Sequence, residues 1–266
     1  MQIKRVILVI AMLVMMVSVA QAQDTARTFI LVHGAFQDAS GWDATLTALE
    51  AAGQTAVAVN LPGRGEDTTP VAELTLNTYR DAVIEVVNAQ SGPVVLVGHS
   101  FGGMVISAVA EAVPQQIETL VYVAAYLPQS GDSLVTLSSQ DHFSLLGQEG
   151  NFLFSEDFAY GLVNEAIFAS AFCPDCTAEQ QTQVAASQLG EPLAPLNEPV
   201  TLTEDAFGSV RKAYILTAED VVVSPQLQAL MLSRTPAARV LALDTGHAPY
   251  ISAPEALAAT LIEASA

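Results

Sequence analysis

Basic side chains are scarce in this chain of 266 residues. It carries 9 lysines and arginines against 28 aspartates and glutamates, which gives a formal net charge of −19. A surface of this kind repels the phosphates of nucleic acids and of anionic membranes, so neither is expected as a partner. The expected partner is a small molecule: among charged substrates a cation suits this surface better than an anion, and a neutral substrate suits it equally well.

Cysteine is also scarce. Cys173 and Cys176 are the only two, in a C-x-x-C spacing, and no second pair or H-x-x-x-H motif is present to complete a zinc site. A thioredoxin-like redox motif would follow a strand and open a helix, and residues 168–172 do not resemble such a strand. In an exported protein the spacing favours a disulfide between Cys173 and Cys176, with two free thiols as the alternative.

Only one long hydrophobic run is present, near the N-terminus. Lys4 and Arg5 precede an apolar run over residues 6–20, and residues 20–22 read Ala-Gln-Ala. This pattern is typical of a cleaved secretory signal peptide. The run is shorter than the ~20 residues that span a bilayer, so we predict a signal peptide over residues 1–22 rather than a membrane anchor. The mature protein is expected to be secreted or periplasmic, without stable membrane association; nothing in the sequence indicates its oligomeric state.

The rest of the chain alternates between strand and helix patterns. Continuous apolar runs typical of buried strands occupy residues 28–32, 55–59, 94–97, 117–124, 213–216 and 239–243. Helical patterns lie between or after them, at residues 43–52, 76–89, 104–112, 226–232 and 254–264. This order predicts an α/β fold with a mostly parallel sheet that is covered by helices on both faces. Ligands of such sheets bind at the carboxyl ends of the strands.

One long segment interrupts this alternation. Residues 127–203 have no clear strand pattern and predict short helices and loops. They contain six of the ten phenylalanines, namely Phe143, Phe152, Phe154, Phe158, Phe168 and Phe172. We interpret the segment as a cap that is folded over a core formed by residues 23–126 and 204–266.

A nucleophile motif follows the strand at residues 94–97. Residues 98–102 read Gly-His-Ser-Phe-Gly, the pattern G-x-S-x-G between a strand and a helix. A serine on such a sharp turn exposes its hydroxyl as a nucleophile, so Ser100 is the predicted catalytic serine.

A serine hydroxyl needs a base, and the base needs an orienting acid. Among the four histidines, His247 follows the last strand and is the predicted base; His99 is a poor one, because its side chain points away from its neighbour Ser100. Asp220 follows the strand at 213–216 and is the predicted acid, with Glu219 as its main rival. This choice gives the chain order Ser, Asp, His.

The oxyanion of the reaction needs two backbone N–H donors. We expect them at Phe101, directly after the nucleophile, and at Ala35, in the loop after the first strand. Gly34 lets the backbone of that loop approach closely. No metal or other cofactor is implied by this constellation.

With these motifs the chain resembles the α/β-hydrolase superfamily, and within it the branch of plant methylesterases, plant hydroxynitrile lyases and small bacterial carboxylesterases. The resemblance runs from about residue 28 to the C-terminus and is carried by residues 31–36, 41–42, 96–103, 122–128 and 246–247. It implies an α/β-hydrolase fold with a mostly parallel central sheet and an inserted helical cap.

The same resemblance separates two chemistries. The lyases of the branch are similar to one another in carrying threonine after the first-loop histidine and lysine after the catalytic histidine. The matching positions here are Gly34 and Ala248, which supply neither a hydroxyl nor a charge, so hydrolysis is favoured over cyanohydrin cleavage. A dehalogenase would be expected to carry aspartate at position 100.

The sequence therefore predicts an exported serine hydrolase that cleaves carboxylic esters through an acyl-enzyme. Phe36, Tyr126 and His142 are expected to contact the substrate. The phenylalanines of the cap favour small to medium apolar or aromatic esters, unless they only fill the interior of the cap. A non-catalytic binding protein on the same fold, a peptidase, a perhydrolase and a lactonase remain as alternatives.

Overall fold

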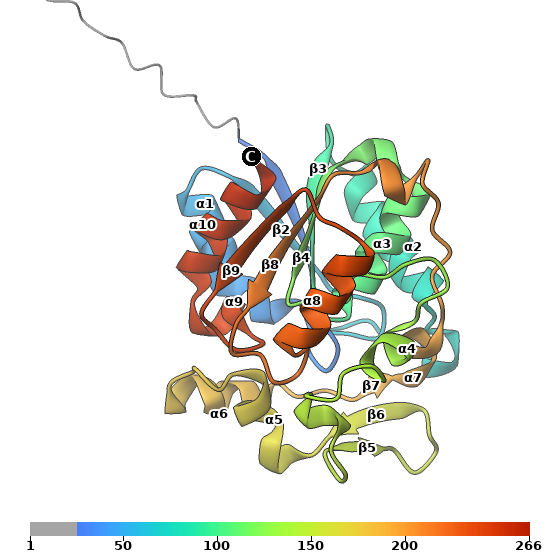
Figure 1. Cartoon of the computed structure of the whole chain (residues 1–266), viewed down its shortest axis with the longest axis vertical. Helices are drawn as coiled ribbons and strands as arrows, with labels where there is room; N and C mark the ends of the chain where they lie inside the picture. The colour runs from blue at the N-terminus through green and yellow to red at the C-terminus, as the bar shows by residue number, and fades with distance from the viewer. Residues whose placement is uncertain (1–25) are drawn as a thin grey trace, which may run out of the picture.

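The computed structural model describes residues 26–266, so the predicted signal peptide at residues 1–22 lies outside the described residues. The centre of the molecule is a six-stranded sheet in which all neighbouring strands are parallel (Figure 1). In spatial order its strands are β2 (Thr55–Val59), β1 (Thr28–Val32), β3 (Val94–His99), β4 (Ile117–Val123), β8 (Lys212–Thr217) and β9 (Arg239–Leu243). The predicted parallel α/β fold is confirmed, with strand bounds within one or two residues of those expected.

Helices cover both faces of this sheet. The chain steps in one direction from β1 to β2 and in the other at each later crossover, so right-handed connections place α1 (Asp43–Ala51) opposite α2 (Leu76–Asn88), α3 (Gly102–Ala112) and α8 (Pro225–Arg234). The C-terminal helix α10 (Pro254–Ser265) packs beside α1, as Figure 1 shows. A single turn, α9 (Pro249–Ser252), precedes it.

Local sequence explains these elements. All six residues of β3 are buried, because helices cover both of its faces. Helix α2 begins after Thr75, whose side chain accepts from the N–H of Thr78 in a capping box. Helix α8 begins after Ser224, which caps the N–H of Leu227, and Pro225 stands in its first turn, where a proline costs no hydrogen bond.

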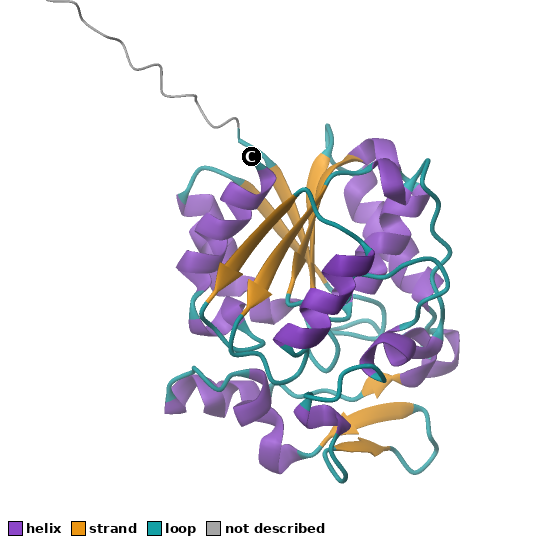
Figure 2. Cartoon of the chain, in the orientation of Figure 1, coloured by secondary structure: helices purple, strands orange, loops and turns teal. Residues whose placement is uncertain are grey.

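The segment between β4 and β8 forms a separate layer, which we call the inserted segment (residues 124–211). Residues 124–197 lie at the end of the sheet toward which the arrowheads of β8 and β9 point, and residues 198–211 run back past α3 to the start of β8 (Figures 1 and 2). The inserted segment contains the helices α4 (Leu134–Ser138), α5 (Glu165–Phe172), α6 (Ala178–Ala186) and α7 (Leu193–Asn197). It also holds an antiparallel sheet of β5 (Phe152–Phe154), β6 (Tyr160–Val163) and β7 (Glu191–Pro192).

This small sheet differs from the helices and loops that the sequence predicts for the segment. Its strands have only two to four residues. A run of that length is too short to show the alternation of apolar and polar residues by which a strand is recognised.

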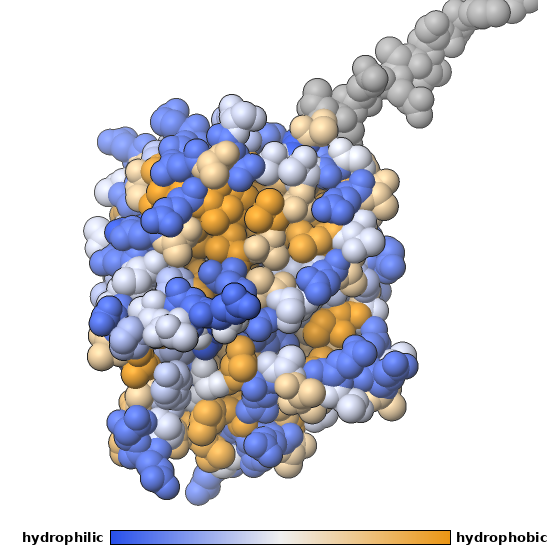
Figure 3. Space-filling view, turned by 180° about the vertical axis from the view of Figure 1, so that it is seen from behind, coloured by the Kyte–Doolittle hydropathy of each residue, from blue (hydrophilic) through white to orange (hydrophobic). Residues whose placement is uncertain are grey.

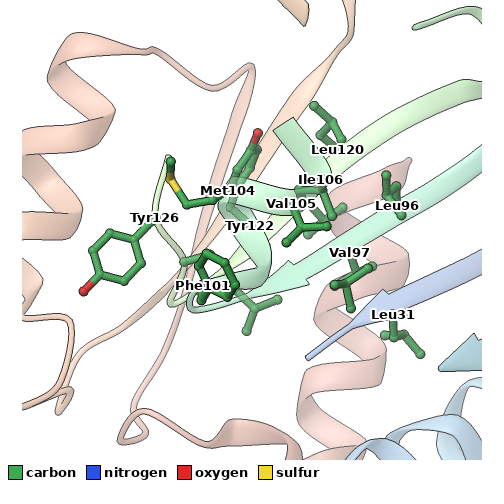
Figure 4. Packing of buried hydrophobic residues seen from close by; sticks show 14 of the residues in the cluster. Leu31, Leu96, Val97, Phe101, Met104, Val105, Ile106, Leu120, Tyr122 and Tyr126 are labelled. Carbon is green, nitrogen blue, oxygen red and sulfur yellow. The ribbon is translucent and has the colours of Figure 1, made fainter. Parts of the chain in front are cut away.

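The apolar core lies between the sheet and its helices. Figure 4 shows side chains of β3, such as Leu96 and Val97, close to those of α3, including Val105 and Ile106. The outer surface is mixed: seen from behind in Figure 3, apolar patches alternate with polar residues. Within residues 26–266, no helix is both long and apolar enough to cross a membrane, and no three His, Cys, Asp or Glu side chains group as metal ligands.

Candidate active site

Ser100 stands on the turn between β3 and α3. Its φ of 51° lies in the left-handed region, which costs a non-glycine residue about 1–3 kcal/mol. Hydrogen bonds hold this backbone in place: the N–H of Ser100 donates to the carbonyl of Val123 (3.2 Å), and its carbonyl accepts from the N–H groups of Gly103 (3.0 Å) and Tyr126 (3.1 Å). The strained turn is therefore fixed by β4 and by the chain that follows it.

Two glycines make the turn possible by close approach. A Cβ atom at Gly98 would lie 2.6 Å from the carbonyl oxygen of Gly102, and one at Gly103 would overlap the carbonyl oxygen of Tyr126. Any side chain at either position would thus force the backbone that carries Ser100 to move.

His247 and Asp220 meet at the same end of the sheet. Asp220 follows β8 and His247 follows β9, and Nδ1–H of the histidine donates to Oδ2 of the aspartate at 2.7 Å. Both side chains are fully buried. Nε2 of His247 is also buried and has no hydrogen-bond partner within the described chain. The ring therefore presents an unused basic nitrogen while its other nitrogen is held by a carboxylate.

The loop after β8 holds the carboxylate of Asp220 on both oxygens. Oδ1 accepts from the N–H groups of Val222 (2.8 Å) and Val223 (2.9 Å), and Oδ2 also accepts from the hydroxyl of Thr217 (3.0 Å). These hydrogen bonds fix the orientation of the carboxylate that accepts from His247. The rival acid, Glu219, is exposed, as is Asp244.

The elbow histidine, His99, precedes Ser100 in the sequence, and its ring lies beside that of His247. Its ring centroid is 4.6 Å from that of His247, and its Nε2–H donates to the carbonyl of His247 at 2.8 Å. Burial is the main cause that holds the pKa of His99 well below its usual range, and the neighbouring His247 lowers it further. His99 is therefore neutral and fixes the backbone of His247, in place of acting as a base.

The two remaining histidines, His33 and His142, are not positioned to act as a base. Burial lowers the pKa of His33 to about 4, so its ring is neutral at pH 7. Its Nδ1–H donates to the carbonyl of Gly34 (2.8 Å), and its Nε2 accepts from the N–H of Leu61 (3.2 Å). His142 is exposed, and the structure does not bring it to the cavity described below, because its neighbour Asp141 bonds the loop at Ser224.

The two expected oxyanion donors are free. Neither the N–H of Ala35 nor that of Phe101 makes a hydrogen bond within residues 26–266. A Cβ atom at Gly34 would lie 2.7 Å from Cβ of Ser100, so the loop after β1 approaches the nucleophile closely. The absence of a side chain at Gly34 thus allows the two segments to come together.

A cavity of about 410 Å³ opens on Ser100. Its lining is mostly apolar and includes Ala35, Phe36, Tyr126, Phe152 and Phe172, together with Val222 and residues of α4 and α7. The ring of Phe172 also lies against that of His247, at 5.3 Å between centroids. Figure 4 shows the Tyr126 side chain directed away from the core residues of β3, and burial raises the pKa of its phenol.

The inserted segment contacts the loops that carry Asp220 and His247. Asp141 accepts from both the N–H (2.8 Å) and the hydroxyl (2.6 Å) of Ser224, just after the Asp220 loop. Cys173 and Cys176 form a disulfide with a Cα separation of 5.2 Å, and Asp175 between them accepts from the N–H of Gly246 at 3.0 Å.

Sequence reasoning missed several residues that support the site, namely Thr217, Asp141, Asp175, Arg64 and Glu191. For all of them except Thr217, which bonds the nearby Asp220 side chain, the partners are distant in the sequence, so no local motif marks them. Arg64 carries the one usable signal, because it is one of only nine basic residues in the chain.

Known proteins resemble this chain over most of its length. The family model described as "Alpha/beta hydrolase family" matches residues 29–260. Salicylic acid-binding protein 2 of Nicotiana tabacum is 30% identical over 89% of this chain and 96% of its own length. Methylesterase 7 of Arabidopsis thaliana is 28% identical over 91% of this chain and 97% of its own length. Against the putative chloroplastic methylesterase 13 of the same plant, at 31% identity, the chain spans 57% of the relative's length.

Solved structures share the fold. Polyneuridine aldehyde esterase superposes with a TM-score of 0.80, at 24% identity over 91% of this chain and 100% of the other. A pyrethroid hydrolase from Sphingobium faniae gives a TM-score of 0.79, at 24% identity over 91% and 98% of the two chains. The chain belongs to the alpha/beta hydrolase family. With relatives named as methylesterases, it is a hydrolase of the carboxylesterase type, as the sequence predicts.

Proposed function

We propose that this protein is an exported serine carboxylesterase that acts through Ser100, His247 and Asp220. The observation that carries the proposal is the buried 2.7 Å pair of His247 and Asp220, which contacts His99, the residue before Ser100 on the strained turn. An imidazole held in this way has one tautomer and one orientation, with Nε2 available to take a proton.

The chemistry follows from these positions. Nε2 of His247 takes the proton of the Ser100 hydroxyl as Oγ attacks the ester carbonyl. The N–H groups of Ala35 and Phe101 stabilise the oxyanion that forms, and loss of one such donor typically costs ~10²–10³ in rate. His247 then protonates the departing alcohol, and water repeats the sequence on the acyl-enzyme to release the acid and restore Ser100.

The cavity supports an apolar or aromatic ester of small to medium size. Its volume of about 410 Å³ lies at the lower end of the usual range for small-molecule pockets, and Phe36, Phe152 and Phe172 form its walls. The rings of Phe152 and Phe172 meet that of Phe36 edge-on at 6.2 and 6.1 Å. A flat apolar acyl or alcohol group suits such walls, and the names of the methylesterase relatives support a small alcohol portion.

Cyanohydrin cleavage is the weaker candidate. A side chain at position 34 would meet Ser100 and His99 within 3 Å, so a hydroxyl there would require both to shift. Ala248 is buried and carries no charge to stabilise a departing cyanide.

Replacement of the nucleophile tests the proposal. We expect Ser100→Ala to keep the fold and to abolish turnover of p-nitrophenyl acetate, because no other group can form the acyl-enzyme. Circular dichroism and thermal unfolding serve as folding controls. Turnover that persists in the folded variant would rule out Ser100 as the nucleophile. A wild-type protein that neither hydrolyses esters nor reacts with a fluorophosphonate probe would support a non-catalytic binding role.

The export part of the proposal has support from the sequence pattern of residues 1–22. Expression of the full chain in a bacterial host should yield protein outside the cytoplasm with Gln23 as its first residue. Mass spectrometry of the purified protein measures this N-terminus, and an intact N-terminus on the cytoplasmic protein would contradict export.

A further inference from the structure

The loop that offers the Ala35 amide continues into Phe36, whose backbone is unusual. Its φ is 66°, a left-handed value that a bulky residue adopts only when its surroundings hold it there. The ring of Phe36 is at the same time a wall of the cavity. The conformation of this residue therefore sets both the direction of the neighbouring Ala35 amide and the shape of the cavity.

Both polar groups of the Phe36 backbone bond the inserted segment just before or at β7. Its N–H donates to Oε2 of Glu191 at 2.8 Å, and its carbonyl accepts from the N–H of Leu189 at 2.8 Å. Glu191 is 155 residues away in the sequence, so the inserted segment closes back on the first loop of the core.

Glu191 in turn pairs with Arg64. Nη2 of Arg64 donates to Oε2 of Glu191, and Nη1 donates to the carbonyl of Gly190 at 3.0 Å. Their side chains are 4% and 1% exposed. A buried ion pair is weak evidence for a role in stability, because apolar residues of similar volume often serve as well. The pair lies beside the loop after β1 that carries Ala35 and Phe36, which we call the oxyanion loop, and this position suggests a role other than stability.

Charge and hydrogen bonding indicate that role. A carboxylate is a stronger acceptor for the Phe36 N–H than a neutral oxygen. Yet an unpaired negative charge one residue from Ala35 would oppose the oxyanion that forms during acyl transfer, because the buried site screens charges weakly. Arg64 cancels this charge and leaves the hydrogen bond in place.

We propose that Glu191 and Arg64 are a positioning pair that holds the oxyanion loop through the backbone of Phe36. The pair touches no reacting atom and acts through the orientation of the Ala35 amide. This inference rests on the proposed function, in which that amide stabilises the oxyanion.

Two double variants separate positioning from stability. Arg64→Met with Glu191→Gln removes both charges but keeps an oxygen that accepts from Phe36. Arg64→Met with Glu191→Leu removes both charges and the acceptor. Asp132→Asn serves as a control, because it breaks a different ion pair, with Arg234 at 2.8 Å, outside the cavity lining.

We expect the Gln variant to retain kcat within about 3-fold of the wild type. The Leu variant should lose kcat at least about 10-fold with little change in KM. The Ala35 N–H donates to the oxyanion of the transition state, so its displacement weakens transition-state binding and leaves substrate binding unchanged. The affinity of the Leu variant for an alkyl trifluoromethyl ketone, whose serine adduct carries an oxyanion, should fall in parallel with kcat. The control should match the wild type.

Equal kcat values in the two double variants would overturn the inference. The inference would also fail if the melting temperature of the Leu variant fell below that of the Gln variant far enough to account for its loss of kcat. Labelling of wild-type Ser100 by a fluorophosphonate probe keeps the two proposals apart: without labelling the proposed function itself fails, and with labelling only the positioning role is at stake.

Discussion

Single hydrogen bonds decide which histidine in this molecule can act as a base. His33 and His99 each have one ring nitrogen bonded to a backbone carbonyl, and burial keeps both neutral. Only His247 combines a carboxylate on Nδ1 with an Nε2 that is free within residues 26–266. The difference lies in their partners and not in the type of residue.

Asp220→Asn tests this at the residue scale. The amide can still accept from Val222 and Val223 through its oxygen, but its NH₂ group then faces Nδ1 of His247 and favours the wrong tautomer. We expect kcat to fall by about 10³–10⁴-fold while the melting temperature changes little, because the loop bonds persist. Steady-state kinetics on p-nitrophenyl acetate measures the effect.

Glu219→Gln provides the matched control, because Glu219 is the exposed neighbour of Asp220. Its kcat should equal that of the wild type. A large loss in this variant together with an active Asp220→Asn enzyme would transfer the role of the acid to Glu219.

At the scale of elements, the inserted segment does more than cover the cavity. Its side chains reach three loops of the candidate site: Glu191 bonds the loop after β1, Asp141 the loop after β8, and Asp175 the loop after β9. Each contact is a carboxylate that accepts from a backbone N–H. Such contacts fix loops whose own sequences do not determine their conformation.

Gly246→Ala tests the contact with the histidine loop. A Cβ atom at Gly246 would overlap Pro174 and lie 2.8 Å from Oδ1 of Asp175, inside the disulfide loop. The adjacent His247 must then shift, and we expect kcat/KM to fall at least about 10-fold, since small displacements of catalytic groups cost rate steeply.

Gly92→Ala is the control for this substitution, because nothing lies within 4 Å of a Cβ atom there. Its kinetics and melting temperature should remain those of the wild type. Normal kinetics in Gly246→Ala would mean that the disulfide loop yields without moving His247.

The sequence predicts the core elements well and the inserted segment poorly, for a physical reason. Strands such as β3 are buried on both faces, so their apolar runs are continuous and easy to recognise. The elbow and Asp220 follow strands of this kind, β3 and β8, and His247 follows β9, an edge strand whose residues are partly exposed. By contrast, β7 has two residues, and the bond from Phe36 to Glu191 spans 155 positions. No local pattern encodes such a contact.

At the scale of the whole molecule, buried neutral histidines make stability depend on pH. Burial lowers the pKa of His33 to about 4, whereas an unfolded histidine titrates near 6.5. Between these values the unfolded chain binds a proton that the native protein does not, so stability falls as pH falls through this window. The loss from His33 amounts to about 3 kcal/mol, and His99 contributes with the same sign.

Denaturant unfolding at pH 7, 6, 5 and 4 measures this loss. Burial raises the pKa of Glu191, which acts in the opposite sense near the acid end of the range, so the comparison is made with His33→Gln. We expect the wild type to lose more stability than this variant between pH 6.5 and 4. Parallel curves would show that His33 accepts a proton in the native state as easily as in the unfolded chain.

The central claim is that Ser100 is a nucleophile activated by His247, and the site of covalent modification tests it most directly. The mature protein is treated with a fluorophosphonate, digested, and mapped by mass spectrometry, with His247→Ala as a parallel sample. We predict one adduct, on Ser100, in the wild type, and at least about 10²-fold slower labelling in the variant. An adduct on a different residue, or equally fast labelling of Ser100 in His247→Ala, would contradict the account.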